Sequence, residues 1–124
     1  MEWTTEVGCA YTATFTIAAE GATVLVSVQL KDYAGNALKV KNAVMFYMTT
    51  DAAGNVIETL GTDAVVATHG IINIVTTNSV YLCVTEDTGI FAVTLDGTGH
   101  LDNYMNVVLP NGKVVTSGAI HFSS

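Results

Sequence analysis

Basic residues are scarce in this chain, and their scarcity argues against two kinds of partner. The 124 residues include four lysines and no arginine against eleven acidic residues, which gives a formal net charge of −7. No lysine lies between Asn42 and Gly112. Proteins that bind nucleic acid or anionic membranes present clusters of basic side chains. We therefore expect neither nucleic acid nor a membrane surface among its partners.

Long apolar runs are also missing, although half of the residues are hydrophobic. The longest run, Ala43 to Met48, has six residues, whereas a membrane-spanning helix needs about 20. The first residues, Met1 to Glu6, lack the basic and apolar regions of a secretory signal peptide, so we expect no signal peptide. The hydrophobic residues are instead spread over many short segments, which is typical of a β-protein.

The sequence shows no spacing that would join metal-binding residues or give a nucleophile a catalytic partner. Cys9 and Cys83 belong to no CxxC pair. We favour two buried free thiols, and a disulfide between them, which would require export or late oxidation, stays open as the alternative. His69, His100 and His121 show no metal-binding spacing. There is also no nucleophile motif and no phosphate-binding loop. We expect no metal, no cofactor and no enzyme active site.

Strand patterns recur along the chain. From Tyr11 to Ile17 apolar residues alternate with threonine, which predicts threonine on the outside and the apolar residues, Tyr11 included, on the inside. Val24 to Leu30 alternates most cleanly. Asn111-Gly112 between two apolar runs is a strong β-hairpin signal. The pattern predicts eight or nine short strands, and this number is typical of an all-β sandwich or barrel. The further strands are expected at 43–49, 71–75, 80–84, 91–95, 104–109 and 113–122, with weaker patterns at 56–60 and at 64–68, where one helical turn fits equally well.

The segment from Ala43 to Thr49 departs from simple alternation, because both of its faces are apolar. Met45 and Tyr47 form the face that a solvated sandwich would make polar. Either a loop or the N-terminal segment covers these two residues, or they lie in a protein interface, where Met and Tyr are enriched. Trp3, a large aromatic residue near the N-terminus, is a second candidate contact. Trp3, Met45 and Tyr47 are therefore the candidate interface residues.

Several motifs resemble those of a known family. Val28 to Asp32, followed by Ala34 to Leu38, resembles the opening strand and D-x-x-G-N turn of bacterial immunoglobulin-like domains of the invasin type. The stretch from Tyr104 to Ile120 resembles the closing hairpin of small structural proteins of tailed bacteriophages. Two further segments resemble parts of the invasin-type domains. Val44–Tyr47 resembles their second core strand, and Glu86–Leu95 resembles their later D-x-x-G strand start.

The resemblance covers about Val24 to Phe122 and implies an immunoglobulin-like antiparallel β-sandwich. We place this domain at residues 21–124, after an N-terminal segment, 1–20, that would serve as an assembly arm or an added strand. Two features depart from the family pattern. Residues 55–89 are longer than the pattern expects, and the first 20 residues have no counterpart in it.

The resemblance also implies a function. The chain is expected to be a non-enzymatic phage virion structural protein, most specifically a capsid decoration or head-associated protein that binds the capsid surface. Its partners would be the major capsid protein or other virion proteins, together with further copies of itself, for example in a trimer. It would be located in the virion, which assembles in the host cytoplasm.

The alternative function is a tail- or fibre-associated recognition module that binds carbohydrate or protein on the host surface. Such a site requires exposed aromatic residues in loops. In the sequence, Tyr33 is the one aromatic residue within a clear turn.

Overall fold

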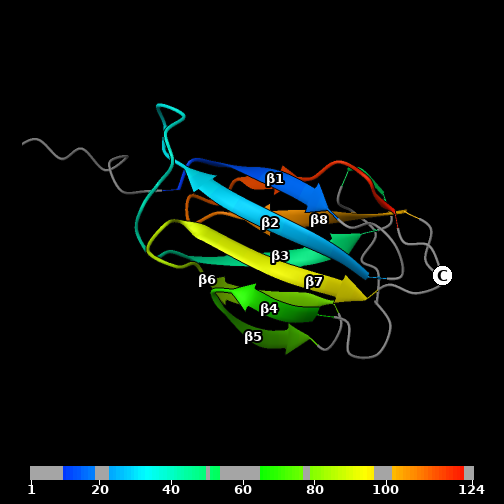
Figure 1. The fold of residues 1–124 in the computed structure, drawn as a ribbon. Helices are drawn as coiled ribbons and strands as arrows, with labels where there is room; N and C mark the ends of the chain where they lie inside the picture. Colours follow the sequence, from blue (N-terminus) through cyan, green and yellow to red (C-terminus); the bar gives the residue numbers. More distant parts are fainter. Residues whose placement is uncertain are drawn as a thin grey trace, which may run out of the picture.

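The structure is a computed structural model that describes residues 10–18, 23–49, 51–53, 65–76, 79–96 and 102–121 of the chain. These residues form β-strands and turns, arranged as two antiparallel sheets that pack face to face (Figure 1). The prediction of an all-β, immunoglobulin-like antiparallel sandwich is therefore confirmed. Within the same ranges, no helix is long and apolar enough to cross a membrane.

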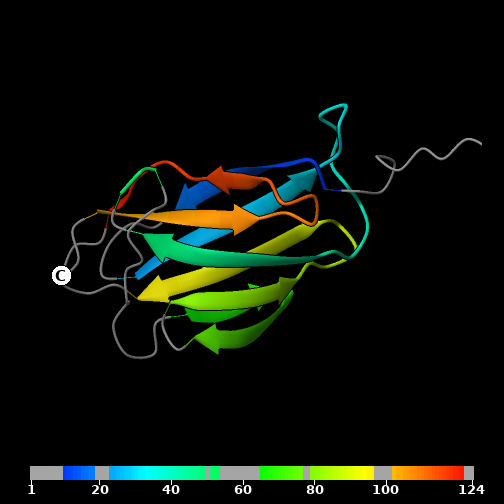
Figure 2. The same cartoon turned by 180° about the vertical axis from the view of Figure 1, so that it is seen from behind.

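The two layers are called sheet A and sheet B. Sheet A lies in front in Figure 1 and sheet B in Figure 2. Sheet A has the order β1-β2-β7-β4, formed by β1 (Thr12–Ala18), β2 (Thr23–Lys31), β7 (Ile90–Asp96) and β4 (Val65–His69). Sheet B has the order β10-β8-β3-β6-β5, with β9 paired to β8; its strands are β10 (Ile120–His121), β8 (Asp102–Val108), β3 (Ala43–Thr49), β6 (Val80–Val84), β5 (Ile71–Thr76) and β9 (Val114–Thr116).

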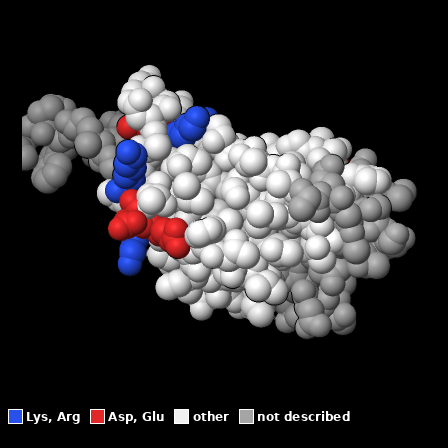
Figure 3. All heavy atoms as spheres, in the orientation of Figure 1, with Lys and Arg blue, Asp and Glu red and all other residues white. Residues whose placement is uncertain are grey.

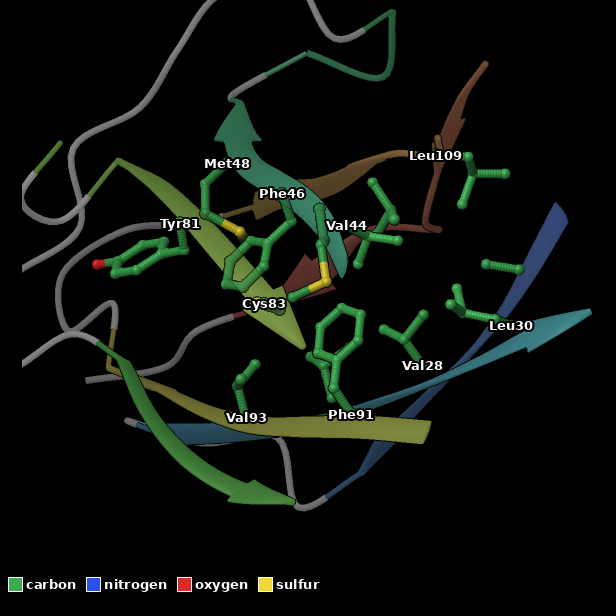
Figure 4. Packing of buried hydrophobic residues seen from close by; sticks show 14 of the residues in the cluster. Val28, Leu30, Val44, Phe46, Met48, Tyr81, Cys83, Phe91, Val93 and Leu109 are labelled. Atoms are coloured by element: carbon green, nitrogen blue, oxygen red, sulfur yellow. The ribbon is translucent and has the colours of Figure 1, made fainter. Parts of the chain in front are cut away.

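The core lies between the sheets and is filled by alternate residues of the facing strands. On β2, the four alternate residues from Val24 to Leu30 are fully buried, which confirms the predicted period of two. Across the layers, the ring of Phe46 stacks on that of Phe91, with centroids 5.9 Å apart (Figure 4). Phe46 also stacks on Tyr81 of the neighbouring strand at 5.0 Å. Burial of each such side chain contributes about 1.5–3 kcal/mol, so this aromatic cluster fixes one sheet against the other.

The strand assignments bear on several expectations. Residues 12–18, which fall inside the expected N-terminal segment 1–20, form β1, and β1 pairs with β2 along its whole length. In the ambiguous stretch 64–68, the described residues 65–68 belong to a strand, β4. The expected strand 113–122 divides into β9 and β10, because Ser117 turns its hydroxyl oxygen to the backbone N–H of Met105 at 2.9 Å. The described residues thus contain ten strands rather than eight or nine, and 56–60 lies outside them.

The hairpin expected at Asn111-Gly112 joins β8 to β9. The N–H of Gly112 donates to the carbonyl oxygen of Leu109 at 2.8 Å, and Val108 pairs with Val114 across the turn. Among the cysteines, Cys83 is a free thiol that is fully buried in the core, as expected. Cys9 lies outside the described residues.

Candidate functional site

The outer face of sheet B is crossed by rows of apolar side chains. The middle row runs in register from β9 to β6 through Val114, Val108, Met45 and Leu82. Because side chains alternate along a strand, these residues point away from the core. The row on one side of it contains Ala43, Val84 and Ile71. The row on its other side contains Tyr47 and Val80. We call these nine residues the apolar face; none of them is charged, and the view of Figure 2 looks onto the strands that carry them.

Much of the apolar face is accessible to solvent. Ile71 is 62% exposed, Val114 46%, Leu82 38% and Met45 36%. The outward positions of β1 and β2 in sheet A, in contrast, are mostly polar, such as Thr14 and Thr16 on β1. A contiguous exposed apolar patch on a folded protein commonly marks a surface where another molecule binds.

The structure places two of the three predicted interface residues on this face. Met45 is exposed at its centre, and Tyr47 is half-buried one row away on the same strand. Trp3 lies outside the described residues. The structure adds Leu82, Ile71 and Val114, whose strand patterns show no unusual feature in the sequence. They belong to the apolar face because of the strand order in sheet B, in which β5 lies beside β6, β6 beside β3, and β9 beside β8.

A buried amide that was not predicted from the sequence lies at one end of the apolar face. Asn106 is fully buried beside Tyr47. Its side-chain nitrogen donates to the Thr49 hydroxyl at 2.9 Å, and its side-chain oxygen accepts from the Thr116 hydroxyl at 2.7 Å. These bonds connect β8 to two of its neighbours, β3 and β9. The signal available in the sequence was one amide, Asn106, among the apolar residues of the expected strand 104–109, because a buried amide requires partners.

Charged residues gather at the end of the sandwich where β2 leads into β3 and β6 into β7. All charged side chains visible in Figure 3 lie at that end, and the visible face of sheet A has none in the part of the chain described. The four lysines of the chain belong to this end: Lys31, Lys39, Lys41 and Lys113. A recess of about 230 Å³ lies where the apolar face meets this charged end, lined by Lys41, Gly70, Ile71, Val84, Thr85 and Glu86.

An exposed aromatic pair lies at the same charged end. Tyr11 was expected to face inward with Ala13, but it is 37% exposed and lies just before β1. Its ring packs edge-on against Tyr33 at 4.9 Å, and the Lys113 ammonium lies 4.4 Å from its centre. This cation–π contact holds Tyr11 at the surface. The alternation along 11–17 did not predict this position, because Tyr33 and Lys113, which contact Tyr11, are distant from it in the sequence.

The titratable groups of the described residues do not form a reactive cluster. The exposed His69 and Glu86 side chains are in contact, with 3.3 Å between the Nδ1 of His69 and a carboxylate oxygen of Glu86. Burial raises the pKa of the Cys83 thiol to about 12, so the thiol is protonated and unreactive at neutral pH. Across the described ranges, no three His, Cys, Asp or Glu side chains converge as a metal site requires.

The geometry of the apolar face suits contact with another molecule more than chemistry. The sequence matches no protein-family model and no curated protein.

Proposed function

We propose that this chain is a non-enzymatic structural protein of a tailed-bacteriophage virion, most specifically a capsid decoration or head-associated protein that binds the capsid surface. The observation that supports this proposal best is the apolar face, with Met45 and Leu82 exposed at its centre. On a chain with a net charge of −7, an uncharged apolar surface of this extent favours contact with a protein partner.

The rest of the molecule supports a role in stable contact. The two sheets are fixed by stacked rings, Phe46 on Phe91, so the apolar face rests on a rigid support. A rigid surface loses little conformational entropy when it binds. The proposed partners are the major capsid protein or other virion proteins, and further copies of the chain. The proposed location is the virion, assembled in the host cytoplasm.

The test is binding to capsids of the encoding phage that lack this protein. Replacing Met45 by Asp buries an unpaired charge in the proposed contact, so we expect at least about a tenfold loss of affinity in a co-sedimentation assay. The matched control is Thr16→Asp, because Thr16 is exposed on the outer face of sheet A, on β1 at the margin far from β4 and β5. The control should bind like the wild type. Wild-type protein that does not bind these capsids, or a Met45→Asp variant that binds as well as the wild type, would contradict the proposal.

A second candidate function is a tail- or fibre-associated module that recognises host-surface carbohydrate or protein. The exposed pair Tyr11 and Tyr33, with Lys113 beside it, favours this alternative, because aromatic faces combine apolar contact with a polar tip. A glycan array distinguishes the two functions. Under the alternative, the wild type binds specific glycans and Tyr33→Ala loses them, whereas a decoration protein gives no signal.

A further inference from the structure

One margin of the sandwich is open in the part of the chain that the structure describes. There, β5 is the last strand of sheet B and pairs with β6 alone, while β4 is the last strand of sheet A. Gly70 joins these two strands, which lie side by side (Figures 1 and 2). An edge strand presents unpaired N–H and C=O groups that can pair with another chain.

β5 has little of the protection that edge strands usually carry. Proteins commonly protect such edges with charged residues or proline, and Ile71–Thr76 contains neither. A bulge between Ile74 and Thr76 interrupts the C-terminal end but leaves Ile71–Ile74 in regular register. Three of its apolar side chains are more than half exposed: Ile71 at 62%, Ile74 at 64% and Val75 at 58%. Such a strand favours a partner that supplies both backbone hydrogen bonds and apolar contact.

The sequence of β5 identifies a second copy of the same chain as that partner. Read from either end, Ile-Ile-Asn-Ile-Val has the same pattern of apolar residues around the central Asn73. We infer that β5 pairs antiparallel with β5 of a second copy, across a two-fold axis that passes beside Asn73. In this register Ile72 faces Ile74 of the other copy and Asn73 faces itself, while Ile71 lies beside the bulge at Val75 of that copy. A shift by one residue would place the Asn73 amide opposite an apolar side chain, which is less favourable.

Charge supports this choice of partner. The chain is strongly acidic, so two copies repel each other unless they meet through a neutral surface. Neither β5 nor its neighbour β6 contains a charged residue. Two copies can therefore meet through the same β5 edge without charge repulsion, as a two-fold contact requires.

The size of the edge sets the expected strength. A strand of this length spans about 20 Å, and β4 extends the contact to the second layer of the sandwich. A stable dimer usually buries about 800 Å² on each partner, and two strand edges provide less than that. The dimer is therefore expected to be weak and to form reversibly as the concentration rises from micromolar toward millimolar.

Sedimentation velocity over that range, with variants at the two-fold axis, tests the inference. Asn73 is exposed, so its replacement should leave the fold intact. Asn73→Lys places two ammonium groups opposite each other, and Asn73→Asp places two carboxylates there. Each variant alone should dimerise about tenfold more weakly than the wild type. An equimolar mixture of the two should recover dimers, because Lys then faces Asp. The controls are Thr14→Lys and Thr14→Asp on β1, the edge strand at the opposite margin of sheet A, which should dimerise like the wild type.

Each other outcome would overturn the inference. The inference is wrong if the wild type stays monomeric at all concentrations or forms a trimer. It is also wrong if the Asn73 variants dimerise like the wild type, or if their equimolar mixture does not recover dimers. Hydrogen exchange on the wild type provides a test that is independent of the variants. The amides of β5 should gain protection at high concentration, and unchanged exchange across Ile71–Thr76 would contradict the pairing.

Discussion

Gly89 provides a sharp test of the packing at the charged end. It ends the turn before β7 with a φ of 77°, in the left-handed region. Its carbonyl oxygen accepts the N–H of Leu30 at 2.9 Å, which attaches the turn to the end of β2. A Cβ atom at this position would overlap the carbonyl oxygen of Leu38 and lie 2.9 Å from the side-chain nitrogen of Gln29. We therefore expect Gly89→Ala to be strongly destabilising.

The magnitude follows from two costs. A non-glycine residue in the left-handed region costs about 1–2 kcal/mol, and forcing a methyl group into a filled space costs about 1–3 kcal/mol more. Gly89→Ala should thus lower the free energy of unfolding by about 2–5 kcal/mol. Gly35→Ala is the matched control, because Gly35 has a φ of 88° and no atom lies within 4 Å of the place that an alanine methyl group would occupy. It should lose only about 1–2 kcal/mol, the cost of the backbone conformation.

Urea unfolding followed by circular dichroism measures both losses, provided that the slope of each transition matches that of the wild type. Thermal unfolding gives a second measure, because 1 kcal/mol corresponds to about 4 °C for a domain of this size. Gly89→Ala should lower Tm by about 8–20 °C and Gly35→Ala by about 4–8 °C. Equal losses in the two variants would refute the overlap with Leu38, and with it the close approach of this turn to the loop between β2 and β3.

Three further predictions concern buried groups. Asn103 is buried opposite Ile120, and its side chain has no hydrogen-bond partner among the described residues; Asn103→Leu should therefore raise the free energy of unfolding by about 1–3 kcal/mol in urea. Asn106→Ala should lower it by about 1–3 kcal/mol, because the hydroxyls of Thr49 and Thr116 lose their partner; no loss would contradict the buried amide network. The Cys83 thiol should react with a thiol reagent only after unfolding. Since its pKa rises from 9.0 to about 12 in the folded protein, the stability difference between wild type and Cys83→Ala should be constant below pH 9.0 and shift against the wild type as the pH approaches 12.

The sequence predicts those parts of the fold that depend on local pattern. Val24 to Leu30 alternates so cleanly that its buried face could be named in advance, and all four of its inner residues are fully buried. The Asn111-Gly112 turn could also be named, because its backbone conformation depends on two adjacent residues. The inner face of β3 followed in the same way, and Phe46 is indeed fully buried.

The order of the strands within each sheet could not be predicted from the sequence. Strand order depends on pairings between residues that are distant in the chain, and the alternation is the same in an edge strand and a central one. The pattern at Ile71 therefore did not show that β5 is an edge, and the patterns of Leu82 and Val114 did not show that they join Met45. The prediction that Tyr11 faces inward was wrong for the same reason, since its contacts are with residues distant in the chain, Tyr33 and Lys113.

The two unusual surfaces of this molecule meet at Ile71, which belongs both to the apolar face and to the β5 edge. Neither surface is needed to fill the core, because the inner residues of β3 and β6 already do so: Val44, Phe46, Met48, Tyr81 and Cys83 are buried. A two-fold axis perpendicular to sheet B would join the two copies of this sheet into one, with both apolar faces on the same side. The proposed dimer would then present twice the apolar surface toward a single partner lattice. Linked sites bind a repetitive surface far more tightly than either site alone, so under the proposed function a weak dimer and a modest contact at Met45 would together suffice for stable attachment.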